Sequence, residues 1–182
     1  MAAIAQLIEA EIPRLRRYAR ALTRGQEGAD DLVQETLLRA LEKTHLWQAG
    51  TNLRAWLFTL LHNNYVNTVR RSARQGHRVD VEFAGLTTPA HQQRALELRD
   101  LERAIARLPE DQRTALLLIA LEGMKYEEAA AVLDVPVGTI RSRLSRAREA
   151  LRQMLDGTVQ ELALPLAALH SGVRPAEPIY AN

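Results

Sequence analysis

A short helix, a break and a second helix rich in arginine constrain this chain more than any other stretch. Residues 126–133 read Tyr-Glu-Glu-Ala-Ala-Ala-Val-Leu, and residues 134–138, Asp-Val-Pro-Val-Gly, interrupt the helical pattern. Residues 137–152 then carry five arginines and a single acidic residue, Glu149. This outline is typical of a helix-turn-helix, in which the second helix enters the major groove of DNA.

The predicted second helix has one apolar and one polar face. Apolar residues recur every three or four positions from Ile140 to Leu151, which predicts a buried stripe. The alternative, a solvated basic face on a structural helix, is less favoured because the turn and the clustered charge occur together. Arginine and serine can bind phosphates or base edges. The candidate DNA-binding residues here are Thr139, Arg141, Ser142, Arg143, Ser145 and Arg146.

Apolar residues at helical spacing predict an all-α fold of two small domains joined by a flexible linker. With 47% hydrophobic and 4% aromatic residues among 182, the composition also favours helices. We expect a first domain over residues 1–76, a linker over 77–93, a second domain over 94–155 and a tail of unknown role over 156–182.

Within the first domain, the pattern predicts three helices, over residues 2–24, 30–41 and 53–74. Pro13 should kink the first helix or split it in two. Residues 23–28 should form a loop, after which Asp30 and Asp31 open the second helix. Thr51 or Asn52 is the expected N-cap of the third helix.

The third predicted helix has a second face suited to nucleic acid. Asn63, Asn67, Arg70 and Arg74 are spaced four, three and four residues apart. Amides can read base edges, arginines can hold phosphates, and Tyr65 could stack on an unpaired base. Such a face is more often plain surface, so this pattern is weak when taken alone.

Catalytic and metal sites are not indicated. Asp31, Gln34 and Glu35 share a helix, but no histidine or glycine-rich loop accompanies these carboxylates, which leaves a protein-binding face or a solvated surface. The five histidines are scattered and there is no cysteine. We therefore expect no metal, no cofactor and no enzymatic activity. Since no apolar run is long enough to span a membrane, we expect a cytoplasmic protein without membrane insertion.

In this order, the segments resemble bacterial sigma factors of the extracytoplasmic-function class. Residues 30–40 resemble the helix of sigma domain 2 that grips the clamp coiled coil of RNA polymerase. Residues 52–58, Asn-Leu-Arg-Ala-Trp-Leu-Phe, resemble the part that melts and captures the −10 element. Residues 108–113 and 137–143 are similar to sigma domain 4, which reads the −35 element.

The resemblance implies partners and site residues. The partners would be the core polymerase, through its clamp coiled coil and flap, promoter DNA and a small anti-sigma factor. The wording of residues 50–58 also resembles the general-stress-response subgroup of alphaproteobacteria, in which a phosphorylated response regulator with a sigma-like domain releases the factor. The implied polymerase-binding residues are Asp30, Asp31, Gln34 and Glu35, and the implied −10 residues are Trp47, Asn52, Asn63, Asn67, Arg70 and Arg71.

Two other hypotheses fit part of the pattern. A regulator that binds operators as a dimer would use the helix-turn-helix, but it would not need residues 30–40 or the asparagine face. A sigma mimic that binds only an anti-sigma factor should have lost basic residues from the recognition helix, whereas five arginines remain.

Overall fold

The computed structural model describes residues 2–23, 26–48, 50–74 and 92–155. Within these ranges all regular structure is helical, which confirms the all-α prediction. The predicted tail, 156–182, lies outside the described residues, and so does the predicted linker except for residues 92 and 93, which already belong to a helix.

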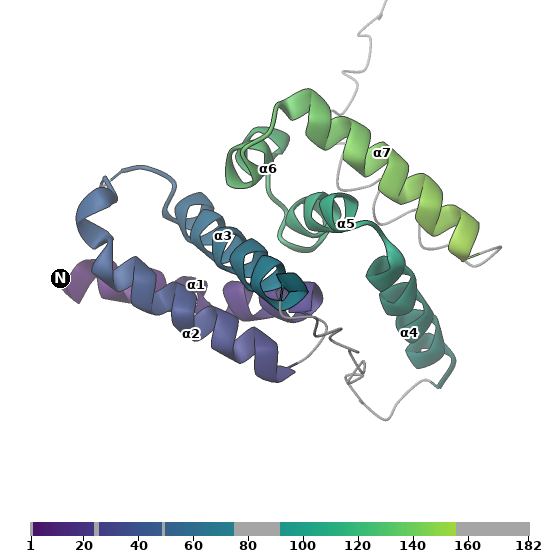
Figure 1. Ribbon diagram of the computed structural model, residues 1–182, viewed down its shortest axis with the longest axis horizontal. Coiled ribbons are helices and arrows are strands. Elements are labelled where there is room, and N and C mark those ends of the chain that lie inside the picture. The colour runs from purple at the N-terminus through teal and green to yellow at the C-terminus, as the bar shows by residue number, and fades with distance from the viewer. Residues whose placement is uncertain (1, 24–25, 49, 75–91, 156–182) are drawn as a thin grey trace, which may run out of the picture.

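The first unit consists of three long helices, α1 (Ala2–Thr23), α2 (Gln26–Glu42) and α3 (Leu53–Arg74). A short 3₁₀ helix, η1 (Thr44–Leu46), follows α2. The three helices pack on one another and bury one side of each (Figure 1). At the centre, the Tyr18 and Phe58 rings are fully buried with their centroids 5.2 Å apart. The aromatic residue at position 58 therefore serves the core.

Two predicted boundaries in this unit can be compared with the structure. Of the two outcomes expected at Pro13, a kink or a split, the split does not occur, since α1 continues through Pro13. Ile8 and Leu15, on either side of the proline, are both buried in the core, and this packing offsets the lost backbone hydrogen bond. The second helix begins at Gln26, so Asp30 and Asp31 lie beyond its first turn, where Glu27 takes the favourable place near the helix dipole.

The second unit contains α4 (Gln92–Arg107), α5 (Glu110–Leu116), α6 (Tyr126–Leu133) and α7 (Val137–Met154). The end of α5 widens into a π-helical turn, η2 (Leu117–Leu121). Asp134, in the left-handed conformation with φ of 51°, ends α6 before α7 begins. Ile140 and Leu144 are buried against α5 and α6, which confirms the helix-turn-helix and its apolar stripe.

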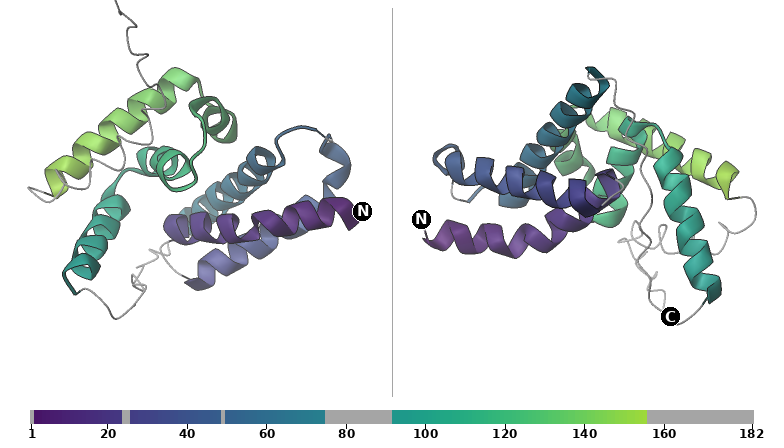
Figure 2. Two further views of the ribbon diagram at one scale, coloured as in Figure 1. Left: turned by 180° about the vertical axis from the view of Figure 1, so that it is seen from behind. Right: turned by 60° about the horizontal axis from the view of Figure 1, so that its bottom comes forward.

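The two units touch along a defined seam. Helix α3 packs along α6, and α1 reaches the π-helical turn η2. Figure 2 shows from two further sides that the purple-to-blue helices and the green helices form two groups that meet here. In the described part of the chain, no helix combines the length and the apolar character needed to cross a lipid bilayer.

Candidate nucleic-acid and polymerase interfaces

The outer face of α7 carries the predicted second-domain DNA residues. Arg141, Ser145 and Arg146 are exposed. Thr139 and Ser142 are half-buried, and the Ser142 hydroxyl donates to the Thr139 carbonyl at 3.0 Å. A hollow of about 460 Å³ lies along this face. The hollow is lined by Tyr126, Arg141, Leu144, Ser145, Arg148, Glu149 and Arg152.

Arg143 differs from its neighbours on α7. Its Nε atom lies 3.3 Å from Oδ2 of Asp111 at the start of α5, and only 21% of its side chain is exposed. The pair ties α7 to α5 inside the second unit. Arg143 was predicted to bind DNA, but in this structure its charge is engaged within the protein, and Arg148, which was not in the predicted set, is exposed instead.

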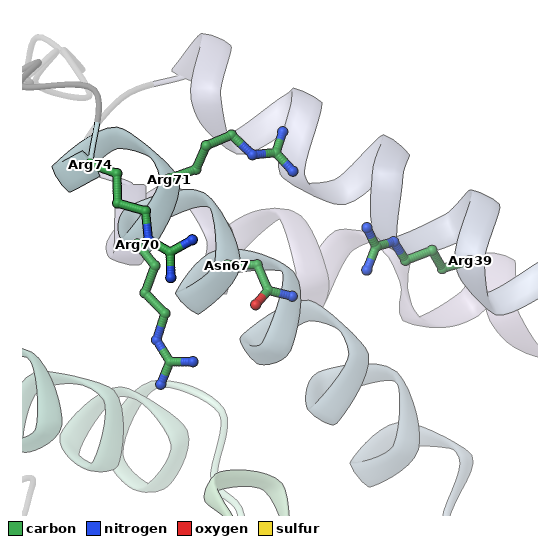
Figure 3. A pocket seen from close by; sticks show the side chains of 5 residues that line it. All are labelled: Arg39, Asn67, Arg70, Arg71 and Arg74. Atoms are coloured by element: carbon green, nitrogen blue, oxygen red, sulfur yellow. The ribbon is translucent and has the colours of Figure 1, made fainter.

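The end of α3 carries a second basic cluster. Asn67, Arg70, Arg71 and Arg74 line a hollow of about 310 Å³ together with Arg39 from α2. Figure 3 shows Arg39 extending from α2 toward the end of α3, where Asn67 and Arg71 lie. A hollow lined by four arginines and one amide suits a phosphate backbone with a base or sugar beside it. Arg74 continued the sequence period, whereas Arg39 gave no signal because α2 brings it there by tertiary packing.

The remaining polar residues of α3 have different roles. Asn63 is exposed. Asn64 is buried, and its amide donates to the Thr36 hydroxyl at 3.2 Å, which ties α3 to α2. Tyr65 is only 7% exposed, and its hydroxyl accepts from Arg113 Nη2 at 3.1 Å. The expectation that Tyr65 offers a stacking surface is therefore wrong for this structure, because the ring is buried in the core.

The loop before α3 holds the other two predicted −10 residues. Trp47 is half-buried. Asn52 is the N-cap of α3, as expected, because its Oδ1 accepts from the Ala55 backbone N–H at 3.0 Å. Its amide nitrogen donates to Glu128 Oε1 of α6 at 2.7 Å. Asn52 thus contacts the second unit at the place where a captured base is expected.

Helix α2 presents a mixed acidic and apolar face. Asp31, Gln34 and Glu35 are exposed, while Asp30 is half-buried. Leu38 and Leu41, on the following turns, are 58% and 49% exposed. Exposed leucines that continue an acidic stripe are typical of a protein-binding surface rather than of a metal site. Within the described residues, no three potential ligands among histidine, cysteine, aspartate and glutamate gather around one point.

Comparison with known proteins identifies the family. The model of the Sigma2 domain of PhyR matches residues 8–62, and the model of sigma-70 region 4 matches residues 98–151. The chain is also 44% identical to the ECF RNA polymerase sigma factor EcfG of Rhodopseudomonas palustris, over 81% of this chain and 82% of that protein. This chain belongs to the extracytoplasmic-function sigma factors. The predicted resemblance is thereby confirmed.

Other members of the family are more distant but cover both units. The ECF RNA polymerase sigma-E factor of Escherichia coli K12 is 34% identical over 72% of this sigma factor and 74% of its own length. Among solved structures, the sigma factor RpoE in complex with the anti-sigma factor NepR from Bartonella quintana superposes with a TM-score of 0.74. It is 38% identical, and the match covers 87% of this chain and 99% of that one.

Proposed function

We propose that this sigma factor binds core RNA polymerase and directs it to a set of promoters, with a separate surface for each partner. The acidic and apolar face of α2 would bind the polymerase clamp. The asparagine and arginine face of α3, with the loop before it, would hold the unpaired −10 strand, and α7 would read the −35 element. One observation carries the proposal: each of the two units has an exposed basic face. The likeness to EcfG covers both of these units.

The mechanism needs binding energy and no covalent step. Unpaired bases gain about 1–3 kcal/mol each by stacking on protein side chains, and arginine–phosphate contacts hold the separated strand. Such contacts form only after the duplex opens, so they favour melting over the closed promoter. The polymerase sets the distance between the −10 and −35 surfaces, and for that reason neither unit needs to bind tightly alone.

The likeness to the RpoE–NepR complex supports an anti-sigma partner. It also supports the proposed division into a first domain over residues 1–76 and a second over 94–155, because the covered length includes both. The resemblance of residues 50–58 to the general-stress-response subgroup supports a role in that response. A factor that works on RNA polymerase would act in the bacterial cytoplasm.

The match of residues 8–62 to the PhyR model favours one second candidate, a sigma-like decoy that binds an anti-sigma factor but no promoter. Both candidates are separated by adding the purified chain to core polymerase on genomic DNA templates. A sigma factor gives transcripts that start at defined positions and require both components, and Asn63→Ala and Arg146→Ala reduce them. A decoy gives no transcripts from any template, even when it captures an anti-sigma factor from a lysate of the source bacterium.

A further inference from the structure

One carboxylate is buried at the seam between the two units. The side chain of Glu122, directly after the π-helical turn, has no exposed surface. Arg17 of α1 donates from Nε to Oε1 and from Nη2 to Oε2, both at 2.9 Å, so the two groups form a bidentate pair. Arg54 of α3 lies 3.4 Å from Oε2 on the other side. One acid of the second unit therefore holds two helices of the first.

The backbone strengthens the same contact. The π-helical turn ends in carbonyl groups that the helix leaves without partners, and the negative end of the helix dipole lies there. Arg17 Nη2 donates to the Leu121 carbonyl at 3.3 Å, and Arg54 Nη2 donates to the Glu122 carbonyl. The hydrogen bond with Glu122 also raises the pKa of Arg17 above its ordinary value. Since a buried carboxylate is costly unless it is paired, these contacts make the seam depend on charge.

The seam places α6 alongside the proposed −10 surface. Glu128, near the start of α6, holds the amide of Asn52 at the start of α3. Residues 131–134, at the end of α6, line a groove of about 750 Å³ opposite Asn63 and Asn67. Helix α6 thus runs beside α3 from Asn52, in the loop that would hold a flipped base, to Asn63 and Asn67, which would hold the following bases. In Figure 1, α6 lies beside α3.

We propose that Glu122 is the latch of a self-inhibited state, in which α6 engages Asn52 and forms the opposite wall of the groove that the unpaired −10 strand would enter. Closing the latch and capturing the strand compete for Asn52 and for the groove along α3. The free factor is then protected from binding single-stranded nucleic acid until the units separate. This inference rests on the proposed −10 role of α3, but the closed state itself is independent of that role.

The test uses the full chain and two latch variants on opposite sides of the seam, Glu122→Gln and Arg17→Gln. The natural sequence has no cysteine, so Glu9→Cys on α1 and Met154→Cys on α7 provide two unique positions for fluorescent dyes. Asp100→Asn, which removes an exposed ion pair within α4, is the matched control. Energy transfer reports whether the units separate, and a random-sequence single-stranded DNA 20-mer, followed by anisotropy, reports strand binding.

We expect both latch variants to raise the open population by about tenfold or more and to tighten binding of the 20-mer by a similar factor, with no change for Asp100→Asn. Equal energy transfer in the latch variants, the control and the parent would refute the latch. Separation of the units without tighter DNA binding would refute the inhibitory role. Arg17→Gln leaves the second unit untouched, so it decides the matter if Glu122→Gln unfolds that unit. Core-dependent transcription by the parent tests the proposed function separately.

Discussion

The pairing of Arg143 with Asp111 predicts that two arginines on one helix have separable roles. Arg143 and Arg146 lie within one turn of α7, and both were expected at the −35 element. Only Arg143 faces an acid, while Arg146 is exposed. We expect Arg143→Ala to destabilise the second unit and Arg146→Ala to weaken duplex binding.

The magnitudes follow from burial and geometry. The Arg143–Asp111 contact of 3.3 Å joins a side chain that is 21% exposed to one that is 47% exposed, so solvent screens it on one side. Exposed pairs contribute about 0.2–1 kcal/mol, and a partly covered pair belongs near the upper end, at about 1 kcal/mol. Loss of the packed arginine stem adds to the cost of Arg143→Ala. An exposed arginine bound bidentately to a guanine is worth about 1–3 kcal/mol, which is the loss expected for Arg146→Ala.

The assay combines urea unfolding with anisotropy of a labelled duplex that carries the −35 element of a promoter found by transcription mapping. A double-mutant cycle over Arg143→Ala and Asp111→Asn isolates the coupling between the two side chains. Asp111→Asn alone should leave duplex binding equal to or tighter than that of the parent, because it frees an arginine. The reasoning is refuted if Arg143→Ala loses as much duplex affinity as Arg146→Ala and leaves the free energy of unfolding unchanged.

Three further outcomes are expected. Asn63→Ala should slow promoter opening, measured with a fluorescent base in the −10 element, and leave −35 duplex binding intact; equal losses in both assays would contradict the division of labour. Phe58→Ala should lower the free energy of unfolding by about 3–5 kcal/mol in urea, because the ring is fully buried, whereas a loss below about 1 kcal/mol would place Phe58 outside the core. Burial, and then Arg143, lower the pKa of His62 from 6.5 to about 4. The unfolded chain therefore binds the proton more strongly, and the free energy of unfolding should fall by up to about 3 kcal/mol as pH drops from 6.5 to 4, a slope that His62→Gln should remove.

The sequence predicted the elements well because their signals are local. The stripe from Ile140 to Leu151 and the N-cap at Asn52 depend on residues within a few positions of each other, and both are present in the structure. The sequence left open whether Pro13 kinks or splits the first helix, because the outcome depends on packing against the core, which outweighs the local cost of a proline.

The site was predicted less completely because much of it depends on contacts between distant segments. Arg39 joins the basic cluster from another helix, so no spacing along α3 could reveal it. The sequence predicts an exposed ring at Tyr65 because no residue near it in the chain indicates its partner, Arg113, which lies 48 positions later. The pairing of Arg143 with Asp111 was hidden for the same reason. The type of residue at each position could be read from the sequence. The partner of each charged side chain could not, because it comes from a distant segment.

The π-helical turn of residues 117–121 means that the seam is encoded in chain length as well as in side chains. A π-turn holds one residue more than the α-helix that would otherwise run through the same place. Inserting a further residue in α5, where no second π-turn would absorb it, would rotate every following position by about 100° around the axis. The Glu122 side chain would be unchanged but would no longer face Arg17 and Arg54. In this protein a one-residue change in register could uncouple the two units while every charged side chain is retained.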